Sequence, residues 1–226
     1  MLYLVNDPLT ERWIGRLSRN ARSLAGFYAE GKDRAHTYAG MVDEILSAVR
    51  AGRRVAAAFY GHPGVFVDPG HEAVRRARAE GFRARMLAAV SAEDCLFADL
   101  GIDPGEAGCQ SYEATAFLVY DYRIEPTALL VLWQIGFVGE RAMPVGPPRP
   151  PLDILVERLR EFYPTSHATV LYEASSYAVC GPAVTQQPLG QLAEAEVTPM
   201  ATLVIPPVAT RSPDPTMLVR LGLTEP

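Results

Sequence analysis

Cysteine is scarce in this sequence, and the cysteines present form no recognisable pattern. There are three, Cys95, Cys109 and Cys180, and none belongs to a CxxC pair. An odd number of widely spaced cysteines builds neither a disulfide framework nor a zinc site of ordinary spacing. We therefore expect a protein of a reducing compartment with no bound metal, in which each cysteine is a small buried apolar side chain.

Long runs of charge of one sign and long apolar runs are also missing. The net charge is −5 with acidic and basic residues mixed along the chain, so no basic stripe is available for a phosphate backbone. The longest apolar run, residues 128–139, is interrupted by Gln134 and Gly136 and is shorter than the roughly 20 residues that cross a bilayer. The apolar residues 1–5 are too few for a secretory leader. These absences argue against nucleic-acid and membrane partners and predict a soluble, cytoplasmic protein.

Familiar catalytic motifs are absent as well. The sequence contains no GxSxG elbow, no Walker loop and no GxGxxG turn. Its four histidines have no matched serine or cysteine that would form a nucleophilic site. The sequence therefore gives no support to a hydrolase triad or a nucleotide-phosphate loop.

The sequence does contain short apolar runs that alternate with amphipathic segments. The runs typical of strands buried on both faces are Leu2–Val5, Val55–Tyr60, Arg85–Val90, Leu129–Ile135, Thr169–Glu173 and Thr202–Ile205. The segments with helical character are Thr10–Ser18, Tyr38–Arg50, Glu72–Glu80, Ala92–Leu100 and Leu152–Phe162. This alternation predicts an α/β architecture with a mainly parallel sheet.

Proline marks the expected division of the chain. Residues 139–151 contain five prolines and two glycines, and such a stretch is an exposed connector because proline cannot donate to a helix or a ladder. We place the boundary of two lobes there or slightly before it. The predicted parts are an N-terminal α/β lobe (1–125), a C-terminal α/β lobe (126–207) and an extended tail (208–226).

Polar segments follow three of the predicted strands. The turn Tyr60–Gly64 (YGHPG) follows the second run, where open α/β sheets bind ligands and where glycine lets a backbone approach closely. An ordinary turn explains it equally well. Ser91 reads as a helix N-cap with Glu93 or Asp94 in the first turn, and a helix N-terminus also suits a carboxylate ligand. Gln134 needs a hydrogen-bond partner, which could be a ligand or a neighbouring loop.

A fourth group consists of Tyr28, Arg34 and Tyr38, on a polar loop that leads into a helix. Arginine can stabilise a developing oxyanion, and a tyrosine near a cation loses its proton more readily. Taken alone, the three residues are better explained as solvated surface residues.

Several of these segments together resemble one known family. The segments are Phe59–Val67, Ala79–Leu87, Val90–Leu100, Gly108–Leu118, Leu132–Gly136 and Ala201–Pro207. They are similar to the tetrapyrrole methylase superfamily and, more closely, to the borosin-type peptide backbone N-methyltransferases. The resemblance implies a class III methyltransferase fold, in which two α/β lobes hold S-adenosylmethionine in a cleft and release S-adenosylhomocysteine. No metal is implied.

The resemblance also assigns site residues. It implies cofactor contacts at Tyr60, His62, Val65, Phe66, Ser91, Ala92, Gln134 and Thr202. It implies catalytic roles for Tyr28, Arg34 and Tyr38 in methyl transfer to a backbone amide nitrogen. That nitrogen is a poor nucleophile because its lone pair is delocalised into the carbonyl. Our hypothesis is that Tyr38 or Tyr28 accepts its proton and that Arg34 stabilises the imidate oxygen.

The sequence departs from the family's pattern at both ends. The family's first strand and glycine-rich loop have no counterpart before Leu2, so we expect unpaired ladder groups, exposed apolar surface and a true start upstream. The chain also stops about twenty residues past Pro207. We therefore expect a separate precursor peptide, methylated in trans by a homodimer. A methyltransferase of the same fold acting on a tetrapyrrole or another small molecule, and a non-catalytic remnant or binding partner, remain open alternatives.

Overall fold

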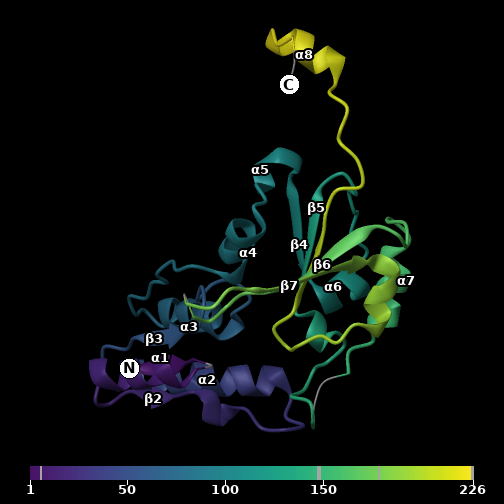
Figure 1. The fold of residues 1–226 in the computed structure, drawn as a ribbon. Helices are drawn as coiled ribbons and strands as arrows, with labels where there is room; N and C mark the ends of the chain where they lie inside the picture. The colour runs from purple at the N-terminus through teal and green to yellow at the C-terminus, as the bar shows by residue number, and fades with distance from the viewer. Residues whose placement is uncertain (6, 147–148, 178, 225–226) are drawn as a thin grey trace. The chain divides into compact units, whose positions relative to one another are not determined.

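The structure, a computed structural model, describes residues 1–5, 7–146, 149–177 and 179–224. Contacts within the chain divide it into two compact units. Unit 1 comprises residues 1–100, 140–148 and 176–180, and unit 2 comprises residues 101–139, 149–175 and 181–226. Most helices and strands of the two units are labelled in Figure 1.

Unit 1 is built on a short parallel sheet with the strand order β2-β1-β3. Its elements are β1 (Leu2–Leu4), α1 (Pro8–Leu17), β2 (Arg22–Ser23), the 3₁₀ helix η1 (Ala25–Phe27), α2 (Arg34–Arg50), β3 (Ala57–Phe59), α3 (Asp68–Ala79) and α4 (Ala92–Leu100). The apolar stripe of α2, with Met41, Ile45 and Leu46, packs with Leu2 and Leu4 of β1. This contact buries the helical stripe that the sequence pattern indicates.

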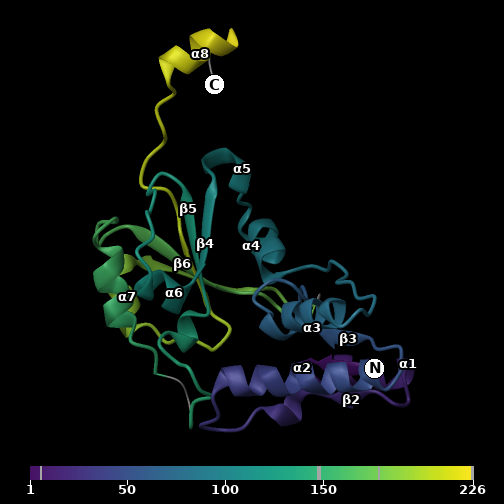
Figure 2. The same ribbon diagram turned by 180° about the vertical axis from the view of Figure 1, so that it is seen from behind.

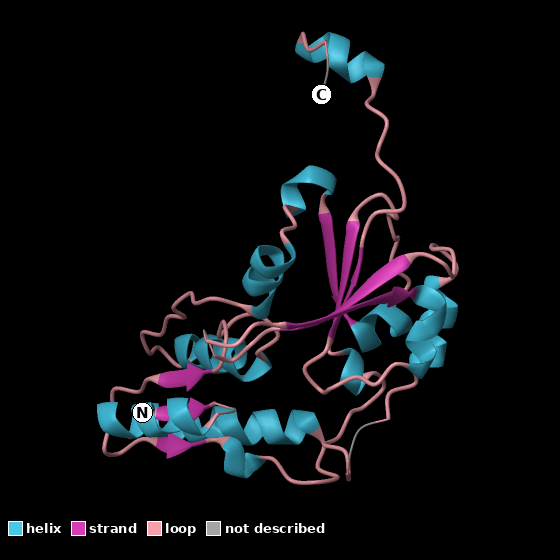
Figure 3. Cartoon of the chain, in the orientation of Figure 1, coloured by secondary structure: helices cyan, strands magenta, loops and turns pink. Residues whose placement is uncertain are grey.

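Unit 2 contains a mixed sheet with the strand order β4-β5-β8-β6-β7, whose strands stand out in Figure 3. Its elements are α5 (Pro104–Ala107), β4 (Cys109–Glu113), α6 (Ala114–Val119), β5 (Leu129–Trp133), η2 (Ile135–Phe137), α7 (Leu152–Leu159), β6 (Ala168–Glu173), β7 (Ala183–Pro188), η3 (Leu189–Glu194), β8 (Thr202–Ile205) and α8 (Pro215–Leu221). Every residue of β5 and β8 is buried. Helices α6 and α7 pack in one apolar cluster with Leu130, Leu132 and Leu203, so they cover the same face of the sheet (Figures 1 and 2).

One predicted strand is wrong. Residues 82–91, which include the run Arg85–Val90, form neither helix nor strand. No strand in the described part of the chain pairs with this segment, and an extended run becomes a strand only when a neighbour accepts its hydrogen bonds. Leu87 and Val90 are consequently 62% and 65% exposed.

One further expectation needs correction. The sheet of unit 1 is parallel, but in unit 2 only β4 and β5 pair in parallel, while β5–β8, β6–β8 and β6–β7 are antiparallel. In the division by contacts, residues 101–125 belong to unit 2, to which the parallel ladder between β4 and β5 joins them.

The start of the tail is more ordered than its composition suggests. Pro147 and Pro148 of the connector lie outside the described residues. In the tail, the Val208 N–H donates to the carbonyl oxygen of Pro126 at 2.9 Å, and Arg211 Nε donates to Thr127 Oγ1 at 2.7 Å. The start of the tail is therefore held on unit 2 before helix α8 begins.

Candidate functional site

Tyr28, Arg34 and Tyr38 come together in unit 1, and Tyr60 joins them. Asp33 caps α2 by accepting a hydrogen bond from the His36 N–H at 3.1 Å, so Arg34 is the first helical residue and Tyr38 lies about one turn further along. Tyr28, just after η1, is hydrogen-bonded to Tyr38 and feels the charge of Arg34. Tyr60, just after β3, feels both Tyr38 and Arg34.

Burial dominates the electrostatics of this tyrosine–arginine cluster. Desolvation raises the pKa of Tyr28 well above its usual range, and Tyr38 and Tyr60 raise it further. Desolvation followed by the proximity of Tyr38 also raises the pKa of Tyr60. Arg34 lowers both pKa values, which is the expected direction, but it does not offset burial. Tyr28 and Tyr60 therefore keep their protons at neutral pH.

The turn after β3 and the start of α4 form a second group. His62 Nδ1 accepts the Gly64 N–H at 3.0 Å, which closes the turn that contains Val65. The Asp94 carboxylate accepts the N–H and the hydroxyl of Ser91, both at 2.7 Å, and the Asp94 N–H donates back to Ser91 Oγ at 3.2 Å. This reciprocal cap starts α4 at Ala92 and confirms Ser91 as an N-cap.

The two halves of this second group lie close to each other. The hydrogen bonds from Ser91 lower the pKa of Asp94, and the proximity of His62 lowers it further. His62 therefore lies near the first turn of α4. The side-chain partner of Ser91 is Asp94.

Backbone strain marks two of the expected cofactor contacts. Phe66 (φ 53°) and Gln134 (φ 61°) are the only non-glycine residues with positive φ in the described part of the chain. This conformation costs on the order of 1–3 kcal/mol and is concentrated at functional sites. The family resemblance implies cofactor contacts at both residues.

In unit 2, Gln134 and Thr202 lie at the same end of the sheet, where β5 ends and β8 begins. The ladder that pairs Leu132 with Leu203 places the residues after β5 beside the start of β8. Close packing fixes the bend at this point, because a Cβ on Gly136 would come within 2.1 Å of the Thr198 carbonyl oxygen. Six of the expected cofactor contacts thus lie in unit 1 and two lie in unit 2.

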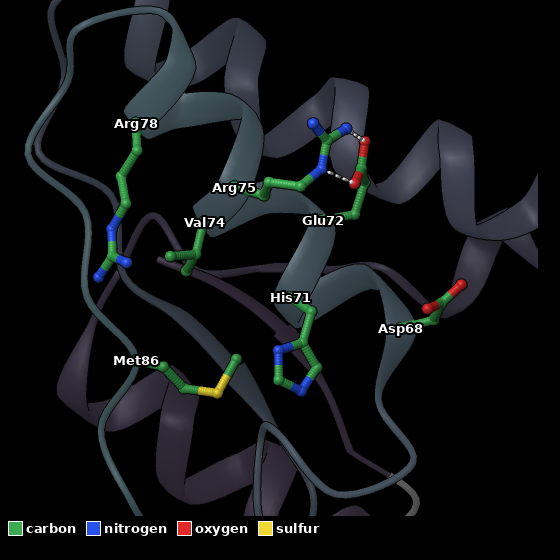
Figure 4. A pocket seen from close by; sticks show the side chains of 7 residues that line it. All are labelled: Asp68, His71, Glu72, Val74, Arg75, Arg78 and Met86. Carbon is green, nitrogen blue, oxygen red and sulfur yellow. Dashed lines mark hydrogen bonds and ion pairs between the residues drawn. The ribbon is translucent and has the colours of Figure 1, made fainter.

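A pocket on unit 1 lies outside both groups (Figure 4). Its volume is about 590 Å³, and it is lined by Asp68, His71, Glu72, Val74, Arg75, Arg78 and Met86. Arg75 pairs with Glu72 at 2.6 Å, and Arg78 Nε donates to the Ala84 carbonyl oxygen at 2.9 Å. None of the residues expected from the sequence lines it, and these two arginines already have partners.

Among the described residues, no three or more histidine, cysteine, aspartate or glutamate side chains are placed to hold a metal ion. The same part of the chain has no helix with the length and apolar character that a membrane span requires.

Two α/β units with polar residues at the ends of their strands define a class III methyltransferase fold. The chain belongs to the tetrapyrrole (corrin/porphyrin) methylase family, whose model matches residues 4–192.

Curated relatives are fungal proteins described as a methyltransferase joined to a cyclic-peptide precursor. The omphalotin A precursor protein of Omphalotus olearius is 40% identical over 99% of this chain and 55% of its own length. A type I borosin precursor protein of Coprinopsis marcescibilis is 41% identical over 92% of this chain and 55% of its own length. The chain thus spans about half the length of these relatives.

Solved structures share the fold. The uroporphyrin-III C-methyltransferase of Thermus thermophilus, in complex with S-adenosylhomocysteine, superposes with a TM-score of 0.55 at 21% identity, covering 90% of this chain and 84% of that one. A cobalt-precorrin-4 methyltransferase gives a TM-score of 0.61 at 12% identity, covering 91% and 83%.

Proposed function

We propose that the protein is an S-adenosylmethionine-dependent methyltransferase that methylates backbone amide nitrogens of a separate precursor peptide. The observation that carries this proposal is the cluster of Arg34 with the hydrogen-bonded pair Tyr28 and Tyr38. Relatives described as methyltransferases joined to peptide precursors support a peptide substrate.

The residues at the strand ends fit the cofactor. Phe66 and Gln134 hold strained backbone, and His62 lies near the capped start of α4. We assign cofactor binding to Tyr60, His62, Val65, Phe66, Ser91 and Ala92 of unit 1, and to Gln134 and Thr202 of unit 2. When bound, S-adenosylmethionine supplies an electrophilic methyl group on a sulfonium.

In this proposal the tyrosine–arginine cluster activates the substrate's amide nitrogen, which is a weak nucleophile. Removing the amide proton frees the nitrogen lone pair and leaves negative charge on the carbonyl oxygen, which Arg34 stabilises as the charge develops. The raised pKa of Tyr28 and its bond to Tyr38 make Tyr28 a hydrogen-bond donor. In this proposal Tyr38 is therefore the proton acceptor.

The test is a methylation assay with purified protein, S-adenosylmethionine and a set of apolar peptides, with tandem mass spectrometry to locate each added methyl group. Arg34→Ala should lower turnover by roughly 10²–10³-fold, because one stabilising contact to a developing oxyanion has about that effect. Arg34→Lys should recover only part of the loss, because lysine lacks the planar fork. Arg53→Ala, which removes an exposed arginine elsewhere in unit 1, is the matched control.

Three results would contradict the proposal. Arg34→Ala turning over at the wild-type rate would remove the arginine from the mechanism. Methyl groups on a tetrapyrrole but on none of the peptides would favour small-molecule methylation. Calorimetry that detects no S-adenosylmethionine binding would favour a non-catalytic protein.

We also propose that the protein works as a cytoplasmic homodimer. The exposed apolar side chains Met217, Val219 and Leu221 of α8 support a contact with a second copy, and free cysteines support a reducing compartment. Light scattering of the wild type and of Val219→Asp measures the oligomeric state.

A further inference from the structure

The proline-rich connector reaches the loop that carries Arg34. Residues 141–143 leave unit 2 after Gly139 and belong to unit 1 by their contacts. Ala142 forms an antiparallel bridge with Asp33. We call residues 141–143 the strap.

Three main-chain hydrogen bonds hold the strap on the loop. The Gly31 N–H donates to the Met143 carbonyl at 2.8 Å, the Met143 N–H donates to the Lys32 carbonyl at 3.0 Å, and the Arg34 N–H donates to the Arg141 carbonyl at 3.0 Å. Because the backbone makes these contacts, they do not depend on which side chains the strap carries. Sequence patterns therefore give little sign of them.

The third bond matters most for Arg34. The first N–H groups of a helix have no acceptor within that helix. The cap from Asp33 serves the His36 N–H, whereas the Arg34 N–H is served by the strap. The backbone of Arg34 is thus fixed from both sides, by α2 and by the strap.

The rest of the loop gives limited support. Gly31 has a φ of +70°. A glycine can adopt many other backbone conformations when no contact holds it in one. Lys32 Nζ donates to the Phe27 carbonyl at 2.7 Å, which ties the loop to η1 through one flexible side chain.

We propose that the strap is a positioning element for the reaction, holding Arg34 within reach of Tyr28 and Tyr60. This inference rests on the proposed function, because it assigns a role to an arginine whose catalytic part is itself proposed.

The test removes one strap donor and leaves its neighbours in place. Met143→Pro deletes the N–H that bonds Lys32. Ala142→Pro is the matched control, because the bonds of the bridge are made by the residues that flank Ala142. Met143→Ala controls for the lost side chain. If Met143→Pro fails to fold, Arg141→Gly with Ala142→Gly loosens the strap while keeping every N–H.

Hydrogen exchange reports the loop directly. The amides of Gly31 and Arg34 should exchange at least tenfold faster in Met143→Pro than in the wild type or in Ala142→Pro. Turnover should fall about tenfold, while the Kd for S-adenosylmethionine stays within twofold. The loss should fall on kcat while KM for the peptide stays within twofold, because Arg34 stabilises charge that develops only in the transition state. A merely structural role would not confine the loss to kcat.

The outcomes separate this inference from the function on which it rests. Fast exchange with wild-type turnover would overturn the strap's role, as would unchanged exchange or a loss that falls on KM for the peptide. If Arg34→Ala itself keeps wild-type turnover, the proposed function fails and the catalytic role of the strap fails with it. The exchange rates then show only whether the strap holds the loop.

Discussion

The two units of the chain differ in how they bury their strands. In unit 2, β5 and β8 run through the middle of a five-stranded sheet and are buried along their whole length. In unit 1 the strands have two or three residues, β2 is exposed, and β3 is an edge whose first residue is exposed. Unit 1 also contains the extended segment 82–91, which pairs with no described strand.

Most of the candidate chemistry lies in the less buried unit. Tyr28, Arg34, Tyr38 and the turn after β3 belong to unit 1, whereas unit 2 contributes Gln134 and Thr202. Binding sites need polar side chains and strained backbone, and both lower the stability of the region that holds them. The comparison leads us to expect that unit 2 supplies most of the stability, whereas unit 1 contains most of the proposed site residues.

Core truncations give the largest expected contrast. Leu203→Ala removes a fully buried side chain at the centre of the unit 2 sheet and should cost about 3 kcal/mol of unfolding free energy, while Leu87→Ala at a 62% exposed position should cost under about 0.5 kcal/mol. Trp13 lies in unit 1 and Trp133 in unit 2, so urea unfolding can be followed by fluorescence in a Trp13→Phe background for Leu203→Ala and in a Trp133→Phe background for Leu87→Ala. Equal costs at the two positions would contradict the comparison.

Sequence patterns predicted elements whose partners are local or fully buried. The apolar runs of β5 and β8 and the stripe of α2 were identified correctly, because burial on both faces or along one stripe leaves a strong pattern. Strand β7, with the sequence AVTQQP, was missed because it is exposed and its stability comes from pairing with β6. The run Arg85–Val90 has the composition of a strand and none of the required neighbours.

In the candidate site too, local contacts could be predicted from the sequence, whereas contacts between distant residues could not. Ser91 was identifiable as a cap because its partner Asp94 is three residues away. The proximity of Tyr60 to Tyr38 and the bonds between the strap and the Arg34 loop join residues far apart in sequence, and backbone bonds leave no compositional trace. The pKa of Tyr28 could not be predicted for a related reason, since it depends on burial as well as on the neighbouring charge.

Tyr163 tests whether a tyrosine of unit 2 with a raised pKa has a role in the reaction, as is proposed for Tyr28 of unit 1, or affects stability alone. Burial raises the pKa of Tyr163 to about 12, and its hydroxyl has no hydrogen-bond partner among the described residues. Between pH 10 and about 12 the unfolded chain loses this proton while the folded chain keeps it, so stability falls as pH rises, by about 2–3 kcal/mol in all. Below pH 10 both states are protonated and the contribution is fully present.

Tyr163→Phe should flatten that alkaline decline and, at pH 7, should raise the unfolding free energy by about 1 kcal/mol, because an unpaired buried hydroxyl is removed. Urea titrations of both proteins at pH 7, 10 and 11 measure the difference. Turnover and cofactor affinity should not change. A loss of turnover would place Tyr163 in the site and weaken the separation of roles between the two units.

Phe66→Gly has the smallest expected effect on stability. It tests the separation of stability and binding between the units at a residue of unit 1. Its φ of 53° is costly for phenylalanine and costs glycine little, and its side chain is 48% exposed, so Phe66→Gly should leave the unfolding free energy unchanged or raise it by up to about 1 kcal/mol. If the strain is kept for the cofactor, the same change should weaken S-adenosylmethionine binding about tenfold by calorimetry. Val67→Gly, one residue further on at a negative φ, is the control and should be destabilising. Weaker binding without lost stability means that the conformation of Phe66 is maintained for the ligand. Lost stability with unchanged binding means that Phe66 contributes to the fold of unit 1, so the strain there is no sign of the site.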